Sequence, residues 1–126
     1  MKNKILLAGL FCCSLISTEA QVLLDKNAGK NSFPIVSPSA NVVVCFDGKD
    51  ETVVRKSVSL FTDDVRRVTG QDLKAQASNP GEVSARYAII VGTAGKSAWI
   101  DALTAKKKID ITPIAGGWER YMICLL

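Results

Sequence analysis

Two continuously apolar runs, at residues 41–46 (NVVVCF) and 88–91 (AIIV), constrain the fold of this chain more than any other feature. Runs without polar alternation are typical of strands that are buried on both faces. Such strands belong to parallel sheets, in which a helix usually makes the crossover between neighbours. The two runs therefore predict a layered α/β domain.

An amphipathic helix is predicted between the two runs. Its apolar side chains recur at i, i+4, i+7, i+11 and i+14, which places them along one helical face. They are Val54, Val58, Phe61, Val65 and Val68. Gly70 follows this stripe and is suited to end the helix in a left-handed conformation.

Two further elements complete the predicted order. A shorter helix is expected from Ser97 to about Lys107, and a third major strand at residues 118–126 (WERYMICLL). Residues 33–36 (FPIV) are a candidate edge strand, and polar residues 71–86 are expected to form a connection. The result is a small, mostly parallel or mixed sheet of three to four strands with two packed helices, in the order β-α-β-α-β.

The first twenty residues have the pattern of an export signal. Lys2 and Lys4 precede an uncharged apolar run at residues 5–16, and small residues Thr18 and Ala20 follow at the positions that a leader peptidase recognises. Cleavage is predicted after Ala20. The run of 12 residues is shorter than the roughly 18 that a membrane span requires.

This pattern divides the chain into a signal peptide (1–20), an irregular lead-in (21–32) and an α/β domain (33–126). A secreted or periplasmic product is expected. A lipoprotein signal is disfavoured, because bulky Phe11 precedes Cys12 and no small residues lead up to either cysteine of the run.

The residue types exclude several classes of chemistry. The chain contains no histidine, which rules out Ser-His-Asp and Cys-His catalysis and histidine-ligated zinc. Cys45 and Cys124, which remain after the predicted cleavage, cannot complete a four-ligand zinc site. Both are expected to be buried free thiols, although a bridge is permitted outside the cytoplasm if their strands are neighbours. The formal net charge of +4 is mild, and the basic cluster at 106–108 has no interleaved aromatics, so no nucleic-acid partner is expected.

Residues 92–97 (GTAGKS) imitate a phosphate-binding loop. Such a loop requires G-x-x-x-x-G-K-[ST], and Ile90 stands where the first glycine should be. The loop is therefore too short to surround a phosphate, and neither a nucleotide nor any other cofactor is expected. Amides at a helix start can still attract an anion, but a tight turn that packs the helix against the strand is the favoured interpretation.

Three segments carry a resemblance to a known family: 64–70 (DVRRVTG), 89–101 (IIVGTAGKSAWID) and 117–121 (GWERY). They are similar, in order, to the patterns D-I-x-x-V-T-G, I-I-V-G-T-x-G-K-S-x-x-I-D and G-K-W-E-x-Y/F, with Gly117 where lysine is usual. These patterns belong to the N-terminal α/β domain of glycoside hydrolase family 115, the secreted xylan α-1,2-glucuronidases. The resemblance covers about residues 33–126.

In that family the domain precedes a large catalytic barrel that carries the acid–base chemistry. The resemblance implies a secreted glycosidase that removes 4-O-methyl-glucuronic acid side chains from xylan, and a chain truncated before the barrel. The implied partners are the barrel of the same polypeptide and, for the full enzyme, xylan-type polysaccharide. No residue here matches a catalytic position of the family, so this chain by itself is expected not to be an enzyme.

The acidic residues agree with that expectation. Glycoside cleavage generally uses two carboxyl groups about 5–10 Å apart across a cleft, and the candidates here lie on predicted helix surfaces, in turns or at a strand start. They are Asp47, Asp50, Asp63, Asp64, Asp72, Asp101 and Glu119. Trp99 and Trp118 are the candidates for contact with sugar or with another domain. The leading interpretation is a non-catalytic accessory domain, and the alternative is a stand-alone secreted module that binds a glycan or an envelope protein.

Overall fold

The computed structural model describes residues 29, 32–37 and 39–126. Five elements follow one another: β1 (Val42–Phe46), α1 (Thr52–Thr69), β2 (Lys74–Ala77), β3 (Tyr87–Val91) and α2 (Ala98–Ala105). The predicted signal peptide with its cleavage point after Ala20, and nearly all of the lead-in, lie outside the described residues.

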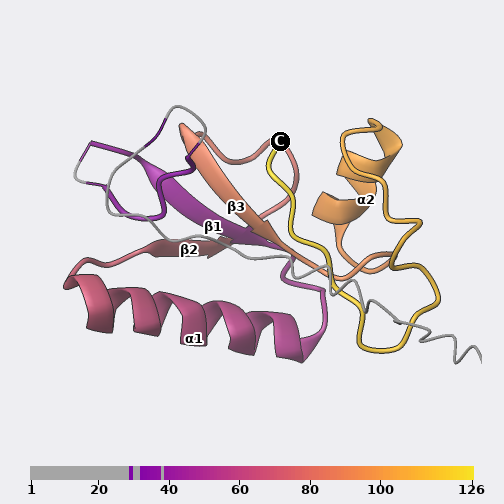
Figure 1. Ribbon diagram of the computed structural model, residues 1–126, viewed down its shortest axis with the longest axis horizontal. Coiled ribbons are helices and arrows are strands. Elements are labelled where there is room, and N and C mark those ends of the chain that lie inside the picture. The colour runs from indigo at the N-terminus through magenta and orange to yellow at the C-terminus, as the bar shows by residue number, and fades with distance from the viewer. Residues whose placement is uncertain (1–28, 30–31, 38) are drawn as a thin grey trace, which may run out of the picture.

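The three strands form one parallel sheet in the order β2-β1-β3 (Figure 1). Val43 of the central strand is aligned with Lys74 on one side and with Ala88 on the other. The prediction of a small parallel sheet with two helices is thereby confirmed.

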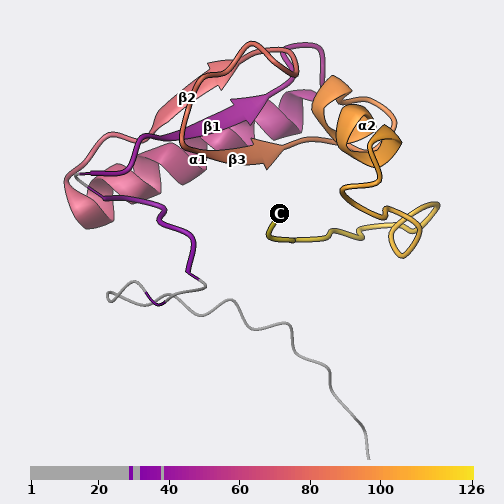
Figure 2. The same ribbon diagram turned by 90° about the horizontal axis from the view of Figure 1, so that it is seen from above.

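The core is built around β1, which is covered on both faces. Val44 and Cys45, whose side chains point to opposite faces, are both 0% exposed. On one face α1 packs its buried residues Val54, Val58 and Val65 against the sheet, while the β2–β3 connection crosses the other face (Figure 2). Each fully buried valine contributes about 1.5–3 kcal/mol relative to an exposed one.

Helix α1 contains the predicted apolar stripe and ends at the predicted glycine. Gly70 takes φ 71°, and its N–H donates to the carbonyl of Arg66 at 2.8 Å, as predicted for a left-handed terminator. The prediction that the apolar stripe is buried is wrong at its last residue, because Val68 is 85% exposed. An 18-residue helix is about 27 Å long and a five-residue strand about 17 Å, so the last turn extends past the sheet.

The third strand is not where the sequence pattern placed it. It is β2 (KAQA), within the segment predicted to be a connection, and the observed order is therefore β-α-β-β-α. Residues 118 and 119 form a turn, residues 120–126 have no regular structure, and all nine are exposed and lie outside the sheet. Glu119 takes φ 54°, a left-handed conformation that interrupts a strand at its start. Residues 33–36, the candidate edge strand, are irregular.

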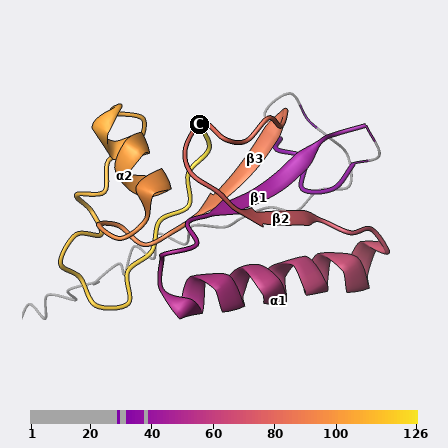
Figure 3. The ribbon, with the colours of Figure 1, turned by 180° about the vertical axis from the view of Figure 1, so that it is seen from behind.

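Helix α2 occupies a different position from α1. It stands beyond the carboxyl ends of the strands instead of lying along the sheet (Figures 1, 2 and 3). Each of its residues keeps at least partial exposure to solvent. It ends earlier than predicted, at Ala105, and Lys107, two residues later, takes φ 55°.

Candidate functional site

Polar side chains gather where β1 and β3 end. In parallel α/β sheets, ligands bind at this carboxyl edge. The turn after β1 supplies Asp47, Asp50 and Glu51, and the turn after β3 supplies Lys96 and Ser97. These five residues are named the carboxyl-edge cluster below.

Asp47 is buried and fixes the start of α2. Its Oδ2 accepts a hydrogen bond from the backbone N–H of Ala98 at 2.9 Å, and its Oδ1 accepts one from Lys49 at 2.8 Å. The bond from Ala98, and after it the bond from Lys49, hold the pKa of Asp47 below its ordinary value. Because Ala98 is the first residue of α2, the carboxylate also faces the positive end of the helix dipole.

Asp50 is buried as well and joins the two turns to each other. Its Oδ1 accepts from the N–H of Glu51 and its Oδ2 from the N–H of Thr93, both at 2.7 Å. On the solvent side, Glu51 forms an ion pair with Lys96. The hydrogen bond and the charge of Glu51 raise the pKa of Lys96.

The amides of the loop that resembles a phosphate cradle are bonded within the protein. Gly95 N–H donates to Asp101 Oδ1 at 3.2 Å, and Lys96 and Ser97 donate to the carbonyl of Thr93 at 3.1 and 2.9 Å. With the amides of Thr93 and Ala98 held by the two buried aspartates, protein carboxylates occupy the place of an anion. This arrangement supports the interpretation as a tight turn.

The turn is closed so tightly that it requires glycine at one position. A Cβ placed on Gly92 would collide with the side chains of Ser97 and Ile100. Ser97 is 0% exposed, and its hydroxyl has no hydrogen-bond partner among the described residues. The turn is therefore closed around Gly92 by the side chains of Ser97 and Ile100.

The two tryptophans have different roles. Trp99 is half-buried, and its indole N–H donates to the carbonyl of Ser78 at 2.7 Å, which ties α2 to the start of the β2–β3 connection. Trp118 is 88% exposed, as is the nearby Tyr121 at 82%. Of the two predicted contact residues, Trp118 is therefore the one whose ring is open to a partner.

The other candidate carboxylates do not converge. Asp63 pairs with Arg66 at 3.0 Å and Asp64 approaches Arg67 at 4.0 Å on the outer side of α1, as expected for a solvated face. Exposed pairs of this kind contribute about 0–1 kcal/mol. The remaining acidic candidates, Asp72, Asp101 and Glu119, are exposed. The two buried aspartates were not distinguished from them by the sequence pattern, which showed only turn residues.

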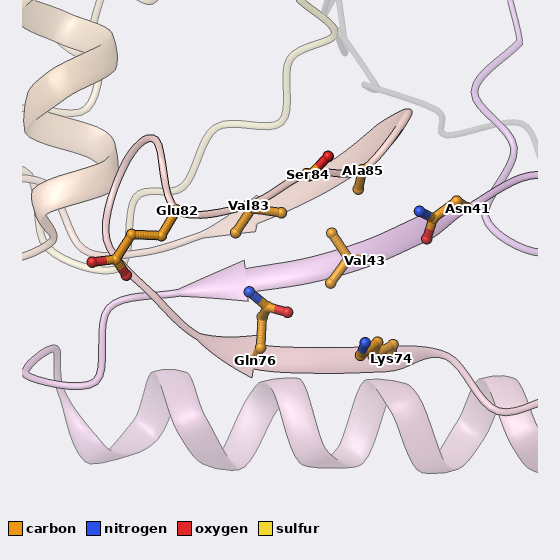
Figure 4. Close-up of a pocket in the computed structure, with 8 residues that line it drawn as sticks. All are labelled: Asn41, Val43, Lys74, Gln76, Glu82, Val83, Ser84 and Ala85. Carbon is orange, nitrogen blue, oxygen red and sulfur yellow. The ribbon is translucent and has the colours of Figure 1, made fainter.

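A shallow hollow of about 120 Å³ lies between the sheet and the β2–β3 connection (Figure 4). It was not predicted, because residues 71–86 carried no strand pattern. Its lining consists of Asn41, Val43, Lys74, Gln76, Glu82, Val83, Ser84 and Ala85. Ligand pockets usually measure about 300–1,000 Å³, so this hollow is too small for a sugar chain. Hydrogen bonds from Asn79 lower the pKa of Glu82 at its rim.

A second hollow, of about 370 Å³, lies beside Arg86 and Tyr87. The Tyr87 ring is already engaged on two sides. Phe33 packs edge-on with the ring centroids 5.6 Å apart, and the Arg86 guanidinium lies 5.5 Å from the ring centroid. These contacts leave little of the ring for stacking on a ligand.

Both cysteines in the described part of the chain are free thiols. Cys45 is buried as predicted, and its burial raises the pKa of the thiol. The prediction of burial is wrong for Cys124, which is exposed because its segment does not join the sheet.

No protein-family model matches this chain, and no curated protein matches it. Within the described residues, no group of three or more His, Cys, Asp or Glu is placed to hold a metal ion. Among the helices of the described ranges, none combines the length and the apolar character that crossing a membrane would demand.

Proposed function

We propose that this chain is a non-catalytic N-terminal domain of a secreted glycoside hydrolase of the xylan α-1,2-glucuronidase kind. The observation that carries the proposal is the state of the carboxyl-edge cluster. Its buried aspartates accept backbone hydrogen bonds at 2.7–2.9 Å and so are committed to holding the fold. Carboxyl groups bonded in this way are poorly placed to act as acid and base.

The segments that resemble the family also have structural reasons for their composition. Residues 64–70 end α1 at a glycine with positive φ. Residues 89–101 contain the tight turn at which Gly92 has no room for a side chain. Both segments are therefore needed for the fold itself, which supports a resemblance at the level of the domain.

An accessory domain needs a surface that a partner covers. The outer side of α1 carries three exposed apolar side chains, Val53 (67%), Leu60 (53%) and Val68 (85%), spaced about two turns apart. We assign this row to contact with the catalytic barrel of the same polypeptide.

Two measurements test the proposal. The DNA that follows the codon for Leu126 should continue as an open frame into several hundred codons with the pattern of a barrel. The 126-residue chain alone should release no 4-O-methyl-glucuronic acid from glucuronoxylan, whereas the product of the longer frame should release it. Hydrolysis by the short chain, or a stop codon directly after Leu126, would contradict the proposal.

The alternative, a stand-alone module that binds a glycan, is favoured by one observation. Trp118 and Tyr121 are both more than 80% exposed and lie three residues apart. Affinity electrophoresis in glucuronoxylan separates the two functions. Retardation of the chain that disappears in Trp118→Ala, but persists in the equally exposed control Val68→Ala, would favour the binding module. The accessory-domain proposal predicts no retardation of any of the three.

A further inference from the structure

The two edges of the sheet are built differently. At the β2 edge, Lys74 is exposed and Pro80 follows shortly after the strand, both of which discourage pairing with another strand. The β3 edge has the sequence YAIIV, with no charge and no proline. Natural sheets normally protect such an edge, and within the described chain β3 pairs on one side alone, with β1.

The groups that face outward from β3 follow from its pairing. Tyr87 donates its N–H to the carbonyl of Asn41, which precedes β1, at 3.2 Å. Because backbone groups alternate in direction along a strand, Ile89 and Val91 also face β1. The N–H and C=O groups of Ala88 and Ile90 therefore face the open edge. Ile89, Ile90 and Val91 are only half-buried, although their composition is that of a fully covered strand.

A segment with the complementary properties lies in the same chain. Residues 120–126, named the tail here, follow the left-handed Glu119 and run as an elongated segment without regular structure (Figure 2). Their large apolar side chains are mostly exposed: Tyr121 82%, Ile123 74%, Leu125 65% and Leu126 67%. The tail runs past the sheet without joining it (Figure 2).

We propose that the tail of one copy adds as a strand to the β3 edge of a second copy, and that the exchange is reciprocal. Among the described residues the tail does not pair with its own β3, so donor and acceptor both lack a strand partner there. Every copy carries one of each, which allows a closed twofold dimer. Main-chain hydrogen bonds to Ala88 and Ile90 hold the strand, and its alternate apolar side chains pack beside the half-buried residues of β3.

The apolar area of the tail and the β3 edge can be compared with that of a specific dimer. Such interfaces bury about 800 Å² on each partner. Tyr121 alone can bury about 150–250 Å², and the aliphatic side chains of the tail add to it. Each copy also contributes its β3 edge, so the area that tail and edge can bury together approaches the area that one partner buries in such a dimer. The apolar row on α1 is not used, so the two proposals involve different surfaces of the domain.

The test is the mass of the full chain in solution, measured by light scattering over a concentration series. We expect a monomer–dimer equilibrium. Ala88→Pro should weaken association at least about tenfold, because proline removes an outward N–H and obstructs the new ladder. Its fold should be retained, since this N–H faces away from β1 and proline is tolerated on edge strands.

A matched pair of variants tests the tail. Ile123→Ser should weaken the dimer by a similar factor, whereas Val68→Ser removes an equally exposed apolar side chain elsewhere and should leave it unchanged. Residues 1–28 are identical in all variants. A difference in dimer affinity between two variants therefore reports on the strand exchange. The proposal is overturned by a monomer at every concentration, or by oligomers that survive Ala88→Pro. Concentration-independent hydrogen-exchange protection of residues 87–91 and 120–126 in a monomer would also overturn it, because it would mean pairing within one chain.

Discussion

The carboxyl-edge cluster and the tail stand in opposite relations to the rest of the molecule. In the cluster, two buried aspartates each accept two backbone hydrogen bonds, and the turn around them has no room for a side chain at Gly92. In the tail, large apolar side chains are left in contact with water. The cluster, which resembles a functional site, thus stabilises the fold. The tail, which carries no catalytic or binding motif, is exposed and can contact a partner.

The largest effect should come from crowding the cluster. Gly92→Ala places a Cβ against Ser97 and Ile100, and we expect a loss of about 3 kcal/mol in the free energy of unfolding. Gly48→Ala is the control in the neighbouring turn, where the new Cβ would meet Ala77 at an ordinary 3.5 Å. Urea unfolding measures both. Equal stability of the two variants would show that the turn is not tightly packed.

A smaller loss is expected when the link between the turns is removed. Asp50→Ala leaves the N–H groups of Thr93 and Glu51 without their acceptor, which should cost about 1–3 kcal/mol. Asp64→Ala, on the solvated side of α1, should change the stability by less than about 0.5 kcal/mol. If both variants unfold at the same urea concentration, Asp50 does not have the role assigned to it.

The cluster should also weaken in acid. The pKa of Asp47 is below its ordinary value of 3.8 in the folded state, so the unfolded chain binds a proton more readily. The contribution of the Asp47 carboxylate to the free energy of unfolding is complete above about pH 5. It is lost as the pH falls through the pKa of Asp47 in the folded state. Asp47→Asn should therefore flatten the dependence of unfolding free energy on pH between about 2 and 5.

Glu82 and Asp110 also have lowered pKa values, and their share of the acid effect should remain in that variant. A slope identical to that of the unmodified chain would exclude Asp47 as a source of acid sensitivity.

The smallest effect on stability is expected outside the sheet. Trp118→Ala removes a large side chain that is 88% exposed, and the unfolding free energy should change by less than about 0.5 kcal/mol. A loss of 2 kcal/mol or more, measured by urea unfolding, would mean that this segment packs on the domain and would remove the contrast with the cluster.

The elements that the sequence predicted are those whose burial is visible in the local pattern. β1 and β3 have apolar runs, and α1 has a stripe at helical spacing ended by Gly70. β2 was missed because KAQA is polar and joins the sheet only through its neighbour β1. Conversely, WERYMICLL has strand composition, but strand formation depends on a partner edge more than on composition.

The candidate site was predictable in its residues and not in its contacts. The sequence predicted the turn before Gly95 and Lys96. Counting back from Gly95 also showed that the turn is too short to be a phosphate loop. The hydrogen bonds that Asp50 accepts from Thr93 and Asp47 accepts from Ala98 join residues 43 and 51 positions apart. Such bonds depend on the alignment of β1 beside β3, which no local pattern contains.

The two free thiols of the described residues should react with a thiol reagent at different times. Cys124 lies open to water while Cys45 is enclosed at the centre of the sheet. In a chain processed after Ala20, a thiol reagent should label the first cysteine at once and the second only when the sheet opens. The interval between the first and second mass additions would therefore measure the rate at which the sheet opens in the native protein, without denaturant.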